Sequence, residues 1–309
     1  MAISAKDVSA LRAKTGVGMM DCKKALEETN GDFDEAIKLL REKGLAVAAK
    51  KAARIAADGK VDILYDEESK TAAMIEINVE TDFAAKNDLF QSFTQECLKV
   101  ILREKPADVE ELLAKPYGDG LTVDEALKEK ILVIGEKITI RRFVTVEGIL
   151  STYIHNKGAI GVIVAVLPDD KAIADEGFNE LKKNLALQVA SMNPVYVTRD
   201  EVPASVIDEE REIITAQVKN DEANAKKPPN VIEKMIEGRV GKYYETNCLL
   251  EQGYVKDDKM TVGEYIESYT KQIGAKVSVA KFYRFEKGEG IQKREDNFAE
   301  EIAKLTGQG

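Results

Sequence analysis

The sequence predicts an α+β protein with a small helical module, a duplicated core of sheets and helices, and helical additions. Three observations predict this class. Residues 1–45 carry helical periodicity with capping residues. Two later regions each combine a β-rich hairpin with helices. The second of these regions also repeats part of the sequence of the first. A chain of 309 residues is long for one compact domain and suits two or three.

Residues 1–45 are expected to form three short helices. Ser4 with Asp7 three positions on is close to a capping box, and Gly16 ends the first helix. Asp21 opens the second helix and Asp32 caps the third. Their apolar residues are spaced to meet in one small core: Leu11, Cys22, Leu26, Ile37 and Leu40. Residues 46–58 follow as a helical linker with the solvated cations Lys50, Lys51 and Arg54.

The first core subdomain is predicted at 59–147 and the second at 148–287. The first has a hairpin at 60–65 and 71–79, a long helix to about residue 102, helices at 108–113 and 123–134, and a strand at 137–147. The second has a hairpin at 149–154 and 160–167, helices at 175–191 and 261–273, and a strand at 276–285.

An internal repeat supports this division of the core. Leu121–Glu147 laid on Met260–Glu286 gives eight identities in 27 positions. Chance gives one or two, so the pattern predicts a duplicated α+β unit. The identities are Thr122/Thr261, Val123/Val262, Glu125/Glu264, Ile134/Ile273, Gly135/Gly274, Lys137/Lys276, Phe143/Phe282 and Glu147/Glu286.

Two helical additions complete the predicted chain. Residues 202–255 are mostly amphipathic helix, broken at a Lys-Lys-Pro-Pro run at 226–229, which predicts an inserted antiparallel helical hairpin. Residues 288–309 are expected to form a C-terminal helical module with Phe298, Ile302 and Leu305 on one face.

Composition excludes several classes of protein. The formal net charge is −10, which argues against broad nucleic-acid or membrane-surface binding. No apolar run reaches the length of a membrane span, and the first residues resemble neither a signal nor a transit peptide. The three cysteines form no CxxC pair, so neither a zinc site nor disulfides are expected. A reduced, cytoplasmic protein is expected.

The catalytic inventory is poor. The single histidine, His155, is the only base available for a triad, and no cysteine has a partner motif. There is no GxxxxGK[ST] phosphate loop, and the two GxG runs lack the third glycine of a dinucleotide fingerprint. We therefore expect a binding protein that is not an enzyme and that carries no cofactor or metal.

The run TDFAAKN at 81–87 joins a buried strand to the long helix and leaves two interpretations open. Thr81 can cap the helix and Asp82 suits its positive end. If one helix continues to about residue 102, Phe83 falls at the edge of the face that carries Phe90, so periodicity favours an ordinary core contact. The alternative is an exposed aromatic wedge beside a carboxylate, which suits insertion into a partner.

Two further sites carry similar alternatives. Met19 and Met20 follow a glycine-rich loop, where they either fill the small core or form an adaptable binding surface. His155 lies in the turn of the second hairpin, before Gly158. A lone histidine there is more often a solvated or hydrogen-bonded turn residue than a functional group.

Four runs resemble the bacterial elongation factor Ts family, and the resemblance covers essentially the whole chain. Leu11-Arg12 with TGVGMMDCKKAL at 15–26 is similar to its N-terminal signature, which belongs to a ubiquitin-associated-like three-helix module. TDFAAKN resembles its second signature, usually TDFVAKN, with Ala84 in place of valine. Residues 284–286 with 288–291 resemble its C-terminal motif. EQGYV at 251–255 departs from the usual Gln-Pro-Phe-Val.

The resemblance implies a translation factor that binds elongation factor Tu, both GDP-bound and nucleotide-free, and promotes GDP release. Asp82 and Phe83 would disturb the magnesium and nucleotide site of that partner. The residues implied in partner binding are Arg12, Met19, Met20, Thr81, Asp82, Phe83, Lys86, Asn87, His155 and Gly158. The alternatives are a passive protein-binding or chaperone-like module, and an RNA-associated factor that uses the linker cations. The acidic charge balance weakens the RNA alternative.

Overall fold

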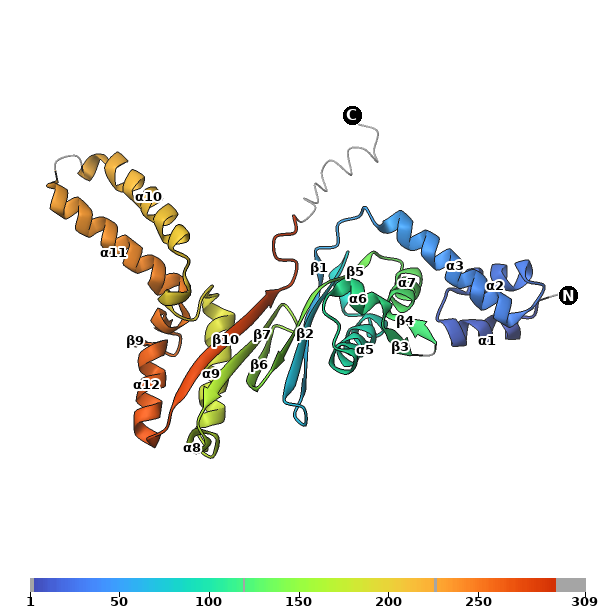
Figure 1. Cartoon of the computed structure of the whole chain (residues 1–309). Helices are drawn as coiled ribbons and strands as arrows, with labels where there is room; N and C mark the ends of the chain where they lie inside the picture. Colours follow the sequence, from blue (N-terminus) through green and yellow to red (C-terminus); the bar gives the residue numbers. More distant parts are fainter. Residues whose placement is uncertain (1–2, 119, 225–226, 293–309) are drawn as a thin grey trace. The chain divides into compact units, whose positions relative to one another are not determined.

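The computed structural model describes residues 3–118, 120–224 and 227–292 (Figure 1). It is a mixture of helices and small sheets, which confirms the α+β class. The described chain divides into two compact units. Unit 1 spans Met1–Leu64, Ile75–Val144 and Glu286–Gly309, and unit 2 spans Tyr65–Met74 and Thr145–Phe285. The C-terminal helix predicted within 288–309 falls mostly outside the described residues.

Unit 1 begins with three helices that surround a small apolar core. These are α1 (Ala5–Thr15), α2 (Met19–Glu28) and α3 (Phe33–Lys51). Ser4 and Asp7 form the capping box, and Asp32 accepts two backbone N–H bonds at the start of α3. The predicted core is confirmed: Leu11, Cys22, Leu26 and Leu40 are buried, and Ile37 packs against them.

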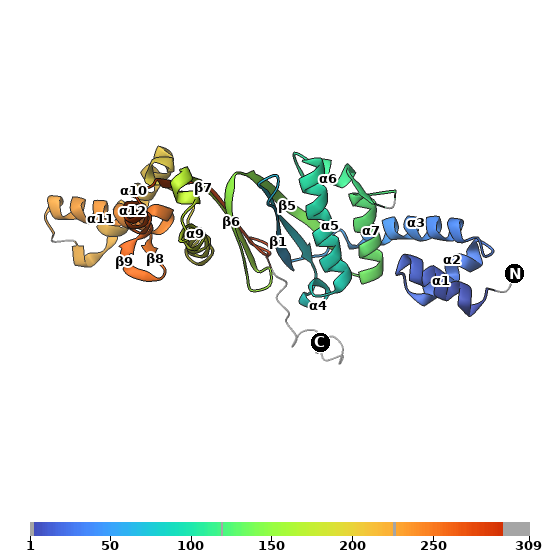
Figure 2. The same ribbon diagram turned by 90° about the horizontal axis from the view of Figure 1, so that it is seen from below.

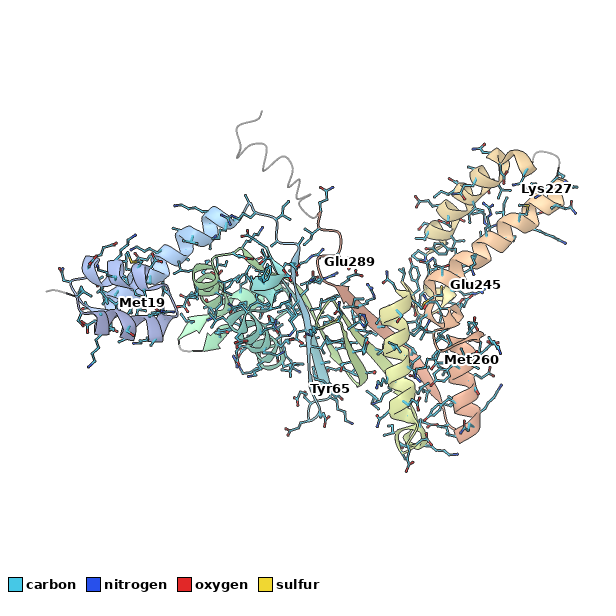
Figure 3. The ribbon with its side chains drawn as sticks, turned by 180° about the vertical axis from the view of Figure 1, so that it is seen from behind. Met19, Tyr65, Lys227, Glu245, Met260 and Glu289 are labelled. Atoms are coloured by element: carbon cyan, nitrogen blue, oxygen red, sulfur yellow. The ribbon has the colours of Figure 1, made fainter. Side chains whose placement is uncertain are left out.

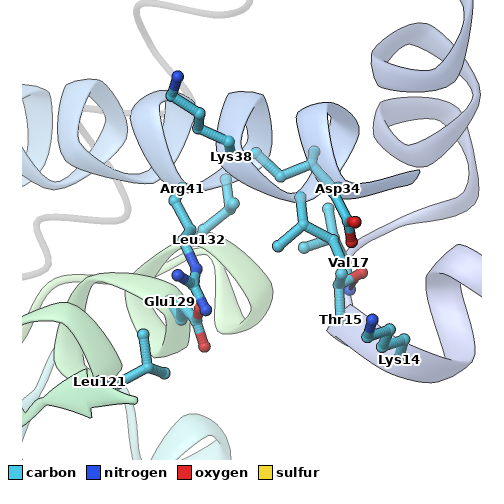
Figure 4. A pocket seen from close by; sticks show the side chains of 11 residues that line it. Lys14, Thr15, Val17, Asp34, Lys38, Arg41, Leu121, Glu129 and Leu132 are labelled. Carbon is cyan, nitrogen blue, oxygen red and sulfur yellow. Dashed lines mark hydrogen bonds and ion pairs between the residues drawn. The ribbon is translucent and has the colours of Figure 1, made fainter. Parts of the chain in front are cut away.

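Helix α3 is longer than the sequence suggested, because it continues through Gly44 into the predicted linker. A Cβ at Gly44 would lie 3.5 Å from the carbonyl oxygen of Lys128. This is an ordinary van der Waals distance, so α3 packs directly on α7 (Val123–Ile134) at this position. Beside this contact, a cleft of about 620 Å³ separates α1 and α3 from α7, with the Arg41–Glu129 ion pair across it (Figure 4).

The rest of unit 1 holds most of a three-stranded sheet with helices beside it; the ends of its strands at 65–66, 71–74 and 145–147 are assigned to unit 2. The strand order is β1-β2-β5, and β2 is buried along its whole length. Figure 2 shows α5 and α7 beside this sheet. The elements are β1 (Asp58–Asp66), β2 (Thr71–Val79), α4 (Asp82–Ala85), α5 (Asp88–Glu104), α6 (Val109–Ala114), β3 (Pro116–Gly118), β4 (Leu121–Thr122), α7 and β5 (Ile138–Glu147).

Unit 2 contains a second three-stranded sheet, of order β10-β7-β6. Strands β6 and β7 pair antiparallel from Ile149↔Val166 to His155↔Ile160, and α9 packs against them around a buried apolar core. The elements are β6 (Ile149–His155), β7 (Ile160–Pro168), α8 (Asp170–Ile173), α9 (Phe178–Met192), η1 (Arg199–Glu201), η3 (Leu249–Glu251), β8 (Gly253–Tyr254), β9 (Asp257–Thr261), α12 (Val262–Ile273) and β10 (Val277–Glu286).

Apart from α6 in the first copy and the helical segment at 199–251 in the second, the two sheets are built from the same order of elements: a hairpin, a short helix, a long helix, a two-stranded ribbon, a helix and a final strand. Several of the repeated identities start or end the helix before the final strand, which is α7 in the first copy and α12 in the second. Thr122 with Glu125, and Thr261 with Glu264, each form a full capping box. Gly135 and Gly274 end the helices in the left-handed conformation. These identities therefore preserve local helix signals.

The predicted helical hairpin is present in unit 2. Helices α10 (Ala204–Asn220) and α11 (Pro229–Asn247) lie side by side in both views, with η2 (Glu222–Asn224) after α10 (Figures 1 and 2). Ile214, Val218 and Val240 form its own small core. After it, Tyr254 stacks on Tyr265 of α12 with ring centroids 4.2 Å apart, which packs the EQGYV run against that helix.

Candidate functional site

The chain leaves buried strand β2 at residues 81–87, which we call the tip. Thr81 has an extended backbone, and its hydroxyl accepts the N–H of Ala84 at 3.2 Å, which starts α4. Helix α4 ends after one turn. The Asn87 side chain then accepts the N–H of Leu89 at 2.8 Å and starts α5. The expected single long helix is therefore two helices.

This break exposes Phe83. Its side chain is 81% exposed, so the core contact that periodicity favoured is wrong. Phe90 is fully buried, as expected for a core residue of α5. The helical phase of Phe90 does not extend to Phe83, because Lys86 and Asn87 interrupt the helix between them. Ala84 and Ala85 are buried instead and hold the turn against unit 1.

Charged neighbours surround the exposed ring. Lys86 donates a hydrogen bond to Asp82 Oδ2 at 2.5 Å, four residues apart on α4, and its Nζ lies 5.7 Å from the centroid of the Phe83 ring. This hydrogen bond is the main reason that the Asp82 pKa is lowered from its ordinary value of 3.8. The tip therefore presents an aromatic ring beside an ionised carboxylate.

Carboxylates outside the signature anchor the tip at its N-terminal side. Glu136 accepts both the backbone N–H of Thr81, at 2.9 Å, and its hydroxyl, at 2.7 Å. Glu80 accepts the backbone N–H of Lys137 at 2.6 Å and pairs with Arg54 at 3.2 Å. Sequence reasoning missed Glu136 and Glu80, because their partners lie about 55 positions away along the chain.

The helical module of unit 1 carries three more of the predicted residues. Met19, labelled in Figure 3, and Met20 open α2. They are 40% and 65% exposed, so they do not fill the core of the module. Arg12 is exposed on α1. A methionine pair on the surface is typical of adaptable binding sites, and this exposure favours the binding interpretation over the packing one.

Both His155 and Gly158 belong to unit 2: His155 is the last residue of β6, and Gly158 lies in the turn before β7. His155 is exposed, and its Nδ1 lies 3.1 Å from the hydroxyl of Tyr153. Gly158 is buried with a φ of +101°, a conformation that favours glycine. The histidine is hydrogen-bonded, as the sequence interpretation allowed, but it ends the strand beside the turn, and its exposure leaves the ring accessible to a partner.

Two negative findings concern the described residues alone. Within 3–118, 120–224 and 227–292, no group of three or more His, Cys, Asp or Glu side chains is placed to hold a metal ion. Over the same ranges, no helix has the length and apolar character that crossing a membrane requires.

The three cysteines are all buried and free, and burial raises the pKa of the Cys248 thiol to about 11.

Comparison with known proteins agrees with the resemblance. A family model described as elongation factor TS matches residues 80–289. A protein of Clostridium botulinum named elongation factor Ts is 45% identical over 99% of this chain and 100% of its own length. Proteins of the same name from Clostridioides difficile and Syntrophotalea carbinolica are each 46% identical, over 98% and 99% of this chain, and 98% and 100% of their own lengths.

These matches cover both units and the tip together. The protein is therefore a translation elongation factor. More narrowly, the chain belongs to the elongation factor Ts family, which confirms the resemblance drawn from the sequence.

Proposed function

We propose that this protein is the guanine-nucleotide exchange factor for elongation factor Tu. It binds the GDP-bound partner, promotes release of GDP and holds the nucleotide-free form. Membership of the elongation factor Ts family supports the partner. The observation that carries the mechanism is the exposure of Phe83, at 81%, on a tip anchored at the end of a buried strand.

Exchange of this kind needs no chemistry by the factor itself. A protein that binds the nucleotide-free partner more tightly than the GDP-bound partner weakens GDP binding by the same ratio. A thousandfold weakening corresponds to about 4 kcal/mol. The Phe83 ring inserts into the partner's nucleotide-binding domain, and Asp82 brings a negative charge toward the bound magnesium ion and phosphates.

One tip is too small to supply this free energy, so the interface is broader. Arg12, Met19 and Met20 extend it over the helical module, and Lys86 and Asn87 border the ring. His155 and Gly158 add a contact from unit 2. We also propose that the chain divides into five modules, at 1–45, 46–58, 59–147, 148–287 and 288–309. We further propose a cytoplasmic location, where translation proceeds.

The test is the rate of GDP release from purified elongation factor Tu loaded with a fluorescent GDP analogue. Catalytic amounts of the full chain are expected to accelerate release, with a rate that rises with its concentration and saturates. A passive binding or chaperone-like module would form a complex and leave the rate unchanged. A protein that instead bound RNA with a steep salt dependence would favour the RNA-associated alternative.

A further inference from the structure

We propose that Glu136 is a positioning residue for the tip: it sets the direction in which Phe83 projects, without itself touching the partner. The inference rests on the proposed exchange function and adds a residue from a different part of the chain. Each oxygen of the Glu136 carboxylate accepts one hydrogen bond from Thr81, one from its backbone N–H and one from its hydroxyl. Both bonds are charge-assisted, which makes them stronger than bonds between neutral groups.

Thr81 is the residue through which this restraint reaches the ring. Its hydroxyl donates to Glu136 and at the same time accepts the N–H of Ala84. Glu136 therefore fixes the rotamer that caps α4, and through its bond to the Thr81 N–H it also fixes the peptide plane that enters α4. Because α4 is a single turn, it has few helical hydrogen bonds of its own to hold its direction.

We call the two hydrogen bonds from Thr81 to Glu136 the clamp. The second copy of the repeat shows that the fold itself does not require it. There, Asp169 alone caps α8 by accepting the N–H of Ala172, and it also accepts the N–H of Lys276. The position equivalent to Glu136 is Ala275, so the second copy has no carboxylate at that position. The first copy divides the same task between Thr81 and Glu80 and adds Glu136.

The copy that carries the extra clamp is the copy that carries the exposed aromatic residue. In α8 the residue that follows Asp170 is Lys171, where α4 has Phe83 after Asp82. A flexible lysine needs no fixed direction, whereas a ring that must enter a pocket gains affinity when its direction is set beforehand. This pairing is the reason that we assign Glu136 to positioning and not to folding.

The end of helix α3 is tied to the same corner. Lys51 donates to the carbonyl of Gly135, and Lys137 donates to the carbonyls of Ala52 and Arg54. These bonds tie residues 135–137 to the end of α3 and the residues that follow it, so the carboxylate of Glu136 acts from a supported segment.

The experiment compares GDP release by the wild-type protein, Glu136→Ala, Glu136→Gln and Glu111→Ala. Glu111 is the matched control. Its carboxylate also accepts a backbone N–H from a loop, that of Ala107, at 2.8 Å, but this loop is not part of the tip. Glu136→Ala is expected to lower the exchange rate at limiting concentration about tenfold, the loss of roughly one charged hydrogen bond. Glu111→Ala is expected to leave the rate unchanged, and the two variants should melt at similar temperatures.

Glu136→Gln separates positioning from charge. A glutamine can still accept the Thr81 N–H and donate to its hydroxyl oxygen, so positioning predicts a rate near that of the wild type. A loss as large as that of Glu136→Ala would mean that the charge acts directly on the partner, and it would overturn the proposal.

A double-mutant cycle with Phe83 gives the decisive result. If Glu136 acts through the ring, Glu136→Ala causes no further loss in a Phe83→Ala background. A further tenfold loss would overturn the proposal. Amide hydrogen exchange of the free proteins tests the clamp independently of the partner: Glu136→Ala should speed exchange of the Thr81 and Ala84 amides, and unchanged protection would refute the inference. Failure of the wild-type protein to release GDP would instead refute the proposed function.

Discussion

Replacement of Phe83 by alanine is expected to impair GDP release far more than folding. In the free protein only about a fifth of this side chain is buried, because it is 81% exposed. A fully buried Phe→Ala change costs about 3–5 kcal/mol, so the burial at this site scales to less than about 1 kcal/mol. The free energy of unfolding, measured by urea denaturation, should therefore change little.

The loss on binding is larger because the ring is available to be buried. A phenylalanine contributes about 200 Å² of surface, of which about 160 Å² is free here. Complete burial against a partner would give about 4 kcal/mol at about 25 cal/mol per Å². Burial of half of that surface corresponds to about 2 kcal/mol, or roughly 30-fold in the concentration of Phe83→Ala needed for half-maximal acceleration of GDP release.

The assay is stopped-flow release of a fluorescent GDP analogue from elongation factor Tu, titrated with each variant. Ile173→Ala is the matched control, because Ile173 is an apolar residue, 49% exposed, on the corresponding short helix α8. It should release GDP at the wild-type rate. If Phe83→Ala unfolds readily while its folded fraction exchanges normally, the exposed-wedge interpretation is refuted and Phe83 has a structural role after all.

Three further outcomes are expected. Met20→Ala should weaken the complex with elongation factor Tu several-fold by titration calorimetry and leave the melting temperature unchanged, since Met20 is 65% exposed; unchanged affinity would remove the helical module from the interface. Lys86→Ala should raise the lowered Asp82 pKa toward 3.8 in an NMR titration. In the wild type this ion pair is complete above pH 3.8 and is lost as the pH falls through the lower folded-state pKa, and an unshifted pKa in the variant would contradict the pair. Glu76→Ala should cost about 3 kcal/mol of unfolding free energy, since this fully buried carboxylate accepts bonds from two arginine side chains; a cost below about 1 kcal/mol would show that they find other partners.

Much of the fold follows from signals that lie close together in the sequence. The capping boxes at Ser4, Thr122 and Thr261 join residues three positions apart, and each starts a helix where the sequence predicts one. Left-handed glycines end the two repeated helices. Asn87 followed by Asp88 is also a local signal, a capping residue before an acidic first turn, and it marks the start of α5 after the tip.

The candidate site was predicted less completely. The resemblance to the family located the tip, yet helical phase alone placed Phe83 in the core. That error came from carrying one helix across Lys86 and Asn87, where the backbone in fact starts again. The exposure of Met19 and Met20 was also undecided by the sequence, because a methionine suits a core and a binding surface equally well.

The sequence by itself determined several helix starts and ends, the repeat and the family of this protein, because these depend on residue type at short separations or on long specific motifs. Only the tertiary structure decided that Phe83 projects into solvent and that Glu136 holds Thr81. Strands β2 and β5 are neighbours in the sheet, so the residues at their ends meet although they are 55 positions apart in the chain. A carboxylate after a helix-ending glycine carries no local sign of such a partner, since the hydrogen bond exists only once the sheet has formed.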